Sequence, residues 1–270
     1  MSNPKYMPLV SIIIVNWNRY IDVVETIENI KKLTYKNKEI IVVDNGSTDT
    51  SLDELKKYKD QIKLIALPIN TGCEDGNNAG ILNAEGEVLL FIDSDAGIEP
   101  SGISKILKVF ESDHTIGIVE PRIIRPSDNK ILNEATNWPI DNIFTGCVVA
   151  IKAEVFCKIG LRPGDFFHYT SEPDICLRSI EKGFRIVHCC DIVGEHREPK
   201  SSRVNKKFFY YVTRNSIWLI WRHYPFLSAI YETCILLLYN LFYSTQCFAT
   251  HYFFLGLYEG IIGFKKHAID

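Results

Sequence analysis

The sequence lacks the short motifs that mark several common classes of protein. Its eight cysteines form no C-x-x-C pair, so zinc knuckles and thioredoxin-like redox sites have no support. It contains neither the G-x-x-x-x-G-K-[ST] loop of a P-loop nucleotidase nor a G-x-G-x-x-G dinucleotide loop. The first ten residues, MSNPKYMPLV, lack the basic and apolar regions of a signal peptide. We therefore expect reduced thiols in a cytoplasmic protein.

The chain also has no excess of charge of one sign, and one long segment has no charge at all. Lysine and arginine number 30 against 33 acidic residues, which argues against a basic nucleic-acid-binding protein. From 233 to 258 there is no Asp, Glu, Lys or Arg, whereas 208–270 holds 18 of the 32 aromatic residues. With 46% hydrophobic residues over 270 positions, the chain can bury a large core and is not disordered. The sequence thus joins two differently solvated parts.

The first part alternates between two hydrophobic periods. Short apolar runs rich in β-branched residues predict strands covered on both faces, at 9–15, 39–43, 62–67 and 87–92. Between these runs, apolar residues at helical spacing predict helices at 20–33 and 77–84. A further helix is predicted to begin near Asp49, which would be its N-cap. Such alternation predicts a parallel sheet with right-handed crossovers, in which ligands lie beyond the carboxyl ends of the strands.

The pattern is less regular from 116 to 192. There we expect a strand at 144–151, a helix at 171–182 and a strand at 184–188. Residues 201–207 are polar and basic, and we interpret them as a hinge before the aromatic tail.

Polar residues follow each of the first four predicted strands. They are Asn16 and Asn18, Asp44 and Asn45, Asn70, Gly72 and Asn77, and finally Asp93, Ser94 and Asp95. One such turn is ordinary, but four on the same sheet edge predict a site. Two carboxylates one residue apart suit a hard divalent cation that bridges the phosphates of a nucleotide, although a helix cap before Pro100 is the alternative interpretation.

Several of these segments together resemble glycosyltransferase family 2. The segments are VSIIIVNWN (10–18), VVDNGSTD (42–49), NTGCEDGNNAG (70–80) and LFIDSD (90–95). The resemblance continues through Thr145-Gly146, EPDICLR (172–178), His196 and Tyr210-Tyr211-x-x-Arg214-Asn215. It is strongest to rhamnosyltransferase-like members that build surface polysaccharides.

The resemblance implies an inverting enzyme of the GT-A class. The fold would be α/β, with a Rossmann-like, mostly parallel central sheet flanked by helices and an aromatic-rich helical extension at the C-terminus. It implies a catalytic domain at 1–204, with a nucleotide-sugar half at about 1–98 and an acceptor half at about 99–204. A helical segment at 205–270 would follow.

The implied reaction moves a hexosyl or deoxyhexosyl group from a UDP- or dTDP-sugar to a hydroxyl of a glycan or lipid-linked acceptor. It would serve surface polysaccharide or glycoconjugate synthesis, with Mn²⁺ or Mg²⁺ as cofactor. One alternative is a non-catalytic sugar-nucleotide-binding or scaffold subunit. Another is a sugar nucleotidyltransferase, but 16–19 is not the glycine-rich basic loop that such an enzyme needs.

The family's roles carry over by position. Asp44 would bind the nucleobase, with the backbone near Asn16 and Asn18 beside it. The resemblance gives donor-side roles to Asn45, Asn70, Gly72, Asn77 and Ser94, and metal-diphosphate roles to Asp93, Asp95 and His196. Asp95 would be the direct metal ligand, and a purely structural His196 is the alternative.

Inverting transfer needs one base to deprotonate the acceptor hydroxyl. By resemblance Glu172 takes that position, with Asp174 as the second candidate. A capping box is the competing interpretation, with Ser171 as N-cap and Asp174 at the third helical position. Glu74 and Asp75 depart from the family pattern, and we expect them to face the sugar or the acceptor.

The tail adds the acceptor side. The segment 233–258 is long enough to span a bilayer as one helix, but Asn240, Ser244 and His251 would form a polar stripe on it. We interpret 225–262 as an in-plane membrane contact, with packing inside the protein or an oligomer and a true span as alternatives. Membrane contact suits a polyprenyl-diphosphate-linked acceptor at the inner face of the cell membrane. The acceptor-side candidates are Arg203, Tyr211 and Arg214.

Overall fold

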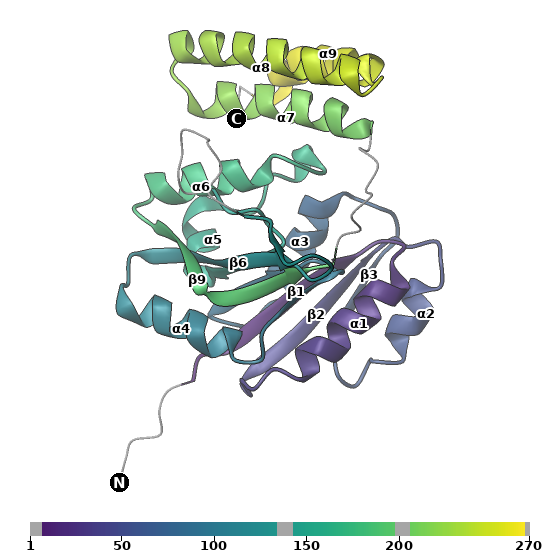
Figure 1. The fold of residues 1–270 in the computed structure, drawn as a ribbon, viewed down its shortest axis with the longest axis vertical. Coiled ribbons are helices and arrows are strands. Elements are labelled where there is room, and N and C mark those ends of the chain that lie inside the picture. The colour runs from purple at the N-terminus through teal and green to yellow at the C-terminus, as the bar shows by residue number, and fades with distance from the viewer. Residues whose placement is uncertain (1–6, 134–142, 198–205, 268–270) are drawn as a thin grey trace.

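The structure is a computed structural model that describes residues 7–133, 143–197 and 206–267. A twisted sheet forms its centre, with helices on both faces (Figure 1). Three helices from the aromatic tail lie beyond one of these faces, next to α6.

The N-terminal half is the parallel unit that the periodicity predicts. Its elements are β1 (Val10–Asn16), α1 (Tyr20–Lys31), β2 (Lys38–Asn45), α2 (Ser51–Lys56), β3 (Lys63–Leu67), α3 (Cys73–Leu82) and β4 (Val88–Ile92). The four strands lie in the order β3-β2-β1-β4, and every neighbouring pair is parallel. Their carboxyl ends therefore share one edge, as expected. Asp49 is not the N-cap of α2, because Thr50 holds that position, but its carboxylate accepts a hydrogen bond from the Ser51 amide at 2.9 Å.

The second half extends this sheet with strands of mixed direction. Its elements are β5 (Ala96–Ile98), α4 (Gly102–Ser112), β6 (Ile116–Arg125), β7 (Lys130–Ile131), β8 (Val148–Lys152), α5 (Ala153–Ile159), the 3₁₀ turn η1 (Gly164–Phe166), α6 (Ser171–Glu181) and β9 (Arg185–His196). The order continues β4-β8-β6-β9-β5, and β8 is antiparallel to both of its neighbours.

Two strand boundaries differ from the prediction in ways that matter for the site. The predicted strand at 144–151 begins only at Val148, since Gly146 adopts a left-handed φ of 90° that interrupts an extended backbone. The predicted strand at 184–188 runs on to His196, because its far half pairs with β5. That pairing sets His196 opposite Ala96, directly beside Asp95.

Alternate side chains of the strands point into two hydrophobic cores, one on each face of the sheet. Ile12 and Ile14 of β1 pack on one face with residues of α1 and α4, whereas Ile13 packs on the other with residues of α5 and α6. Both faces are covered, which explains why the strands read as continuous apolar runs.

The tail forms α7 (Lys207–His223), α8 (Phe226–Gln246) and α9 (Thr250–His267). The single helix predicted across 233–258 is therefore wrong. The chain turns at 247–249, where Phe248 has a left-handed φ of 51°. His251 consequently lies on a different helix from Asn240 and Ser244, and the predicted polar stripe does not exist as one surface.

Asn240 and Ser244, the two residues of α8 that were predicted to form part of a polar stripe, face inward. Asn240 and Ser244 are buried, and Asn240 Nδ2 donates to Thr213 Oγ1 of α7 at 3.3 Å. The α7–α9 contact is close, because a Cβ on Gly256 would lie 2.4 Å from the Tyr210 carbonyl oxygen, and Trp218 Nε1 donates to the Gly260 carbonyl at 3.0 Å. Leu236 and Leu237 of α8 and Leu257 of α9 pack toward α7, whereas other apolar side chains of these two helices, such as Leu238 and Tyr258, face outward.

Candidate functional site

The loops after β1 and β2 are joined by side-chain hydrogen bonds. Asn16 Nδ2 donates to Asp44 Oδ1 at 3.2 Å and to Ser47 Oγ at 3.3 Å, and the Ser47 amide donates to Asp44 Oδ2 at 3.1 Å. Asn18, with a left-handed φ of 54°, accepts hydrogen bonds from the Thr48 and Asp49 amides. The buried Asn16 Oδ1 has no hydrogen-bond partner among the described residues. A hydrogen-bond donor on a bound ligand would satisfy this oxygen.

The donor-side residues predicted between β2 and α3 organise one loop. Asn45 bridges it, donating to the Gly72 carbonyl at 2.8 Å and accepting from the Thr71 amide at 3.0 Å. The Gly72 amide donates to Asn70 Oδ1 at 2.9 Å. Gly72 has a φ of 91°, and a Cβ there would lie 2.5 Å from the Phe167 carbonyl oxygen, so only glycine fits. Asn77 lies within α3, where it donates to the Cys73 carbonyl.

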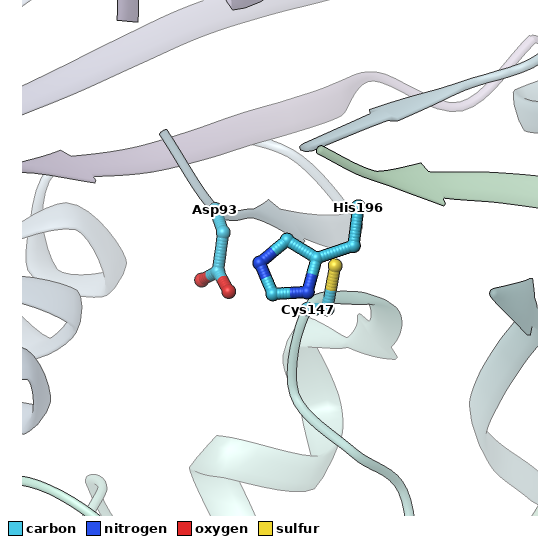
Figure 2. Close-up of side chains that lie close together, drawn as sticks. All are labelled: Asp93, Cys147 and His196. Carbon is cyan, nitrogen blue, oxygen red and sulfur yellow. The ribbon is translucent and has the colours of Figure 1, made fainter. Parts of the chain in front are cut away.

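The carboxylates after β4 meet a histidine from the end of β9. In Figure 2 the Asp93 carboxylate and the His196 ring point toward one another, with the Cys147 thiol beside them. The potential ligand atoms of these three residues all lie within 4.8 Å of one another. His196 Nε2 is also 3.2 Å from Asp95 Oδ1, and Arg19 forms an ion pair with the other oxygen of Asp95. Ser94, which separates the two carboxylates in the sequence, is buried, and its carbonyl accepts a hydrogen bond from Thr26 Oγ1.

The two carboxylates have opposite proton affinities. Burial raises the pKa of Asp93 to about 7, although the neighbouring His196 opposes this. Burial also acts on Asp95, but His196 and Arg19 outweigh it and lower the pKa of Asp95 to about 2. A divalent cation fits this donor set, because two carboxylates and one imidazole supply the oxygen and nitrogen ligands it needs, and its charge would favour an ionised Asp93.

Glu172 stands at the start of α6 with its carboxylate partly exposed. Its Oε1 lies 3.7 Å from Arg162 Nη2, and a Cβ on Gly146 would come within 2.7 Å of the same oxygen. Burial, with the nearby Glu74 adding to it and Arg162 opposing it, raises the pKa of Glu172 to about 7. A carboxylate with that pKa is suited to take up a proton near neutral pH.

Asp174 is held in a different way. Its side chain has no solvent exposure, and it accepts from Arg178 Nε at 2.8 Å, Arg222 Nη1 at 3.2 Å and His223 Nε2 at 2.9 Å. Burial alone would raise the pKa of Asp174, but these partners, His223 foremost, lower it to about 2. Asp174 thus connects α6 to α7, and both of its carboxylate oxygens accept hydrogen bonds within the protein.

The capping-box interpretation of this segment is wrong. The N-cap position of α6 is Thr170, which has a left-handed φ of 69° and makes no side-chain cap. Ser171 is already helical, and its Oγ accepts from Arg162 Nη2 at 3.4 Å. The acidic residues of this turn are thus oriented by tertiary contacts.

The loop before Ser171 is bent unusually and is held by α7. Phe167, Tyr169 and Thr170 all have φ between 62° and 69°. Asn215 Nδ2 lies within hydrogen-bond distance of the carbonyls of Phe166, His168 and Tyr169, at 2.9–3.0 Å. Arg214 Nη2 donates to the Phe166 carbonyl at 2.9 Å.

The acceptor-side candidates are placed around this loop. Arg214 is buried, and its guanidinium faces the loop carbonyls and the ring of Trp218 at 4.6 Å. Tyr211 stacks on Phe167 with ring centroids 5.4 Å apart. Arg203 lies outside the described residues.

Sequence reasoning missed Arg162 and misjudged Glu74. Arg162 Nε donates to Glu74 Oε2 at 2.7 Å, and both side chains are almost completely buried. Glu74 therefore faces Arg162, whereas Asp75 is exposed. The only signal in the sequence was the unusual acid at 74, because its partner is 88 residues away.

The chain matches the family model described as Glycosyl transferase family 2 over residues 11–170. An uncharacterized glycosyltransferase of Nostoc sp. is 32% identical over 132 residues, which are 47% of this chain and 40% of the relative. One from Rickettsia typhi is 28% identical over 224 residues, covering 76% of this chain and 67% of the relative. This chain matches less than half of the Nostoc protein's length.

Solved structures share the fold. A mannosyltransferase from Pyrobaculum calidifontis in complex with GDP-Man and Mn²⁺ aligns with a TM-score of 0.68 at 19% identity, over 96% of this chain and 88% of its own. S. aureus TarS 1-349 in complex with UDP-GlcNAc aligns at 0.58 and 18% identity, over 78% and 66%. GalNAc-T7 with UDP, GalNAc and Mn²⁺ aligns at 0.63 and 17% identity, over 79% and 48%. The predicted α/β fold of the GT-A class is confirmed.

The ion pairs of Asp174 make a prediction about stability. Because the folded-state pKa of Asp174 is about 2, below the ordinary value of about 3.9, its contribution is present above pH 4 and is lost as the pH falls toward 2. Asp174→Asn should lower the free energy of unfolding at pH 7 by about 3 kcal/mol, and this deficit should shrink by about 2 kcal/mol at pH 2. Urea unfolding at several pH values measures both quantities.

The matched control is Asp53→Asn, an exposed acid on α2 whose ion pair with Lys56 is a surface one. It should change the free energy of unfolding by less than about 0.5 kcal/mol at any pH. An Asp174→Asn deficit that stays constant with pH would contradict a salt-bridged, ionised Asp174.

Proposed function

The chain belongs to glycosyltransferase family 2, and from this premise we propose that it is a metal-dependent inverting glycosyltransferase. The observation that carries the proposal is the pairing of two features on one edge of the sheet. One is the cluster of Asp93, Asp95 and His196, which suits a cation and a diphosphate. The other is Glu172, whose pKa of about 7 suits a general base.

The nucleotide would lie at the ends of β1 and β2. The unpartnered Asn16 Oδ1 and the Asp44 carboxylate are adjacent acceptors, and the imide N–H of uracil or thymine is a matching donor. This supports a UDP- or dTDP-sugar as donor. The loop at 70–77, which Asn45 holds, would contact the ribose and the sugar. The transferred group would be a hexose or deoxyhexose, as in rhamnosyltransferase-like members of the family.

Asp93, Asp95 and His196 would hold Mn²⁺ or Mg²⁺. When bound, the metal neutralises charge that develops on the departing nucleoside diphosphate. The relatives with Mn²⁺ in their structures, the Pyrobaculum mannosyltransferase and GalNAc-T7, are consistent with this assignment.

Glu172 performs the proton transfer. Its carboxylate accepts the proton of the acceptor hydroxyl while that oxygen bonds to the anomeric carbon from the face opposite the diphosphate. The bond from the anomeric carbon to the diphosphate breaks with its electron pair, and the configuration inverts. Because Glu172 must be ionised, transfer should decline as the pH falls below about 7.

The outward face of α8 and α9 would carry the protein to its acceptor. It exposes Leu227, Leu238, Phe242 and Tyr258, each more than half exposed, while Asn240 and Ser244 of α8 face the protein. The described residues include one helix, α8, that is long and apolar enough to cross a membrane by length and composition. An apolar face rich in Phe and Tyr suits the interface of a lipid bilayer. We therefore propose peripheral binding at the inner face of the cell membrane, and a polyprenyl-diphosphate-linked acceptor in surface polysaccharide synthesis.

Replacing the base tests the reaction. Glu172→Gln should keep nucleotide-sugar binding and reduce transfer by about 100-fold or more, because the amide cannot take up the proton. The measurements are donor affinity by calorimetry and release of nucleoside diphosphate with acceptor present. Glu154→Gln, an exposed acid on α5, is the matched control and should keep full activity.

Near-normal turnover by Glu172→Gln would contradict the assignment of the base. A wild-type protein that binds sugar nucleotides but neither transfers nor hydrolyses them would instead favour a binding or scaffold subunit.

Thermal shift tests the metal site and the donor. UDP-, dTDP- and GDP-sugars are compared with and without Mn²⁺, and the true donor should stabilise the protein more when Mn²⁺ is present. At 100 times the dissociation constant the gain would be about 2.7 kcal/mol. His196→Ala should lose the Mn²⁺-dependent part, whereas the exposed His114→Ala should keep it. A Mn²⁺ effect that survives in His196→Ala would remove this histidine from the site.

Flotation with phosphatidylglycerol and phosphatidylethanolamine vesicles tests the membrane surface. Wild-type protein should float, and Leu238→Glu with Phe242→Glu should stay at the bottom, because two charges would have to enter the interface. Leu82→Glu on α3 is equally exposed but distant in the fold, and it should float normally. A wild-type dimer that does not float and that Leu238→Glu dissociates would show that a second copy covers this face.

A further inference from the structure

A buried ion pair lies beside the proposed base and takes no part in the proposed proton transfer or metal binding. Glu74 is on α3, and Arg162 is in the loop between α5 and η1. Arg162 Nε donates to Glu74 Oε2 at 2.7 Å, and their side chains are only 4% and 2% exposed. Burying two charges costs free energy that their attraction does not always return, so a packed apolar pair would serve stability as well. A role outside stability would account for this pair.

The guanidinium of Arg162 is fixed from several sides. Asn78 brackets its backbone, because the Arg162 amide donates to Asn78 Oδ1 at 2.9 Å and Asn78 Nδ2 donates to the Arg162 carbonyl at 3.0 Å. The guanidinium lies over the ring of Phe91, 5.4 Å from its centroid. This positive charge therefore has one position, set by α3 and β4.

The free end of that guanidinium points at the start of α6. Arg162 Nη2 donates to Ser171 Oγ at 3.4 Å and lies 3.7 Å from Glu172 Oε1. A single side chain thus connects α3 to the base and to the residue before it. Residue 171 is a serine and not an acid. The charged groups near Glu172 are therefore Arg162 and Glu74, which is the ion-pair partner of Arg162.

We propose that Arg162 is a positioning residue for Glu172, with Glu74 as the counter-ion that keeps its hold on the base weak. This inference rests on the proposed function, in which Glu172 is the base. Arg162 alone would lock Glu172 into a tight ion pair that is a poor base. Glu74 shares the guanidinium, so Glu172 stays oriented and still takes up a proton.

The electrostatics of this cluster predict opposite effects for its two members. The groups that face Glu172 are Glu74 and Cys73 from α3, Arg162, and Cys176 from α6. Glu74 raises the pKa of Glu172 and Arg162 lowers it. Loss of Glu74 should therefore lower the pH at which transfer is half-maximal, and loss of Arg162 should raise it.

The experiment is a pH profile of kcat for Glu74→Gln, Arg162→Met, Arg162→Lys and the double variant Glu74→Gln with Arg162→Met. We expect the midpoint to fall by about one pH unit in Glu74→Gln and to rise by about one unit in Arg162→Met. Arg162→Lys should restore much of the midpoint but less of kcat, because an ammonium lacks the planar fork that holds two oxygens. The double variant should return toward the wild-type midpoint.

Arg185→Met, an exposed arginine on β9, is the matched control and should keep both kcat and its midpoint. Folding is followed by circular dichroism and donor binding by thermal shift, and KM for the donor should stay constant in all variants. If Arg162→Met does not fold, Glu74→Gln and the double variant measure the same coupling.

Two results separate this inference from the function on which it rests. If Glu172→Gln is inactive but folded Glu74 and Arg162 variants keep the wild-type midpoint, the pair is structural and the inference is overturned. If Glu172→Gln stays active, the base itself is misassigned, whatever the Arg162 variants show.

Discussion

The attachment of α7 to the loop at 165–170 is the constraint on which the candidate site depends. This loop carries three non-glycine residues with left-handed backbone, each of which costs about 1–2 kcal/mol in isolation. It persists because the amide of Asn215 reaches three of its carbonyls and Arg214 binds two. The loop leads directly into Ser171 and Glu172. The direction in which the proposed base points is therefore decided by a helix that follows it by about forty residues.

The same helix makes a second joint to the site. Arg222 and His223 of α7 bind Asp174 on the first turn of α6, and Phe166 packs with Ile217 and Trp218. The aromatic tail is consequently part of the packing that holds the candidate site in place. α7 contacts α6 through Asp174, and α8 and α9 pack against α7.

Each carboxylate at this edge has a distinct set of partners, and the partners decide its proton affinity. Asp174 and Asp95 face cations and are held ionised, with pKa values of about 2. Asp93 and Glu172 are only partly buried but have fewer cationic partners, and desolvation raises the pKa of each to about 7. In the proposed reaction, a bound metal ion would offset the charge of Asp93, and the proton of the acceptor hydroxyl would neutralise that of Glu172. The proposed roles thus follow from how far hydrogen bonds and nearby cations offset the desolvation of each carboxylate, although the carboxylates look alike in the sequence.

The sequence alone determined the parallel half of the sheet, the edge on which the polar loops meet, and the family. These depend on local periodicity and on short motifs whose residues lie within a few positions of one another. Tertiary structure decided the rest. The extent of β9 depends on pairing with β5, the partner of Glu74 lies 88 residues away, and that of Asp174 lies 48 away. The break at 247–249 and the inward turn of Asn240 depend on packing against α7. Contacts at such separations produce no periodic pattern in the sequence. The reason is that the partner of a charged or amide side chain depends on which distant segment the fold brings beside it.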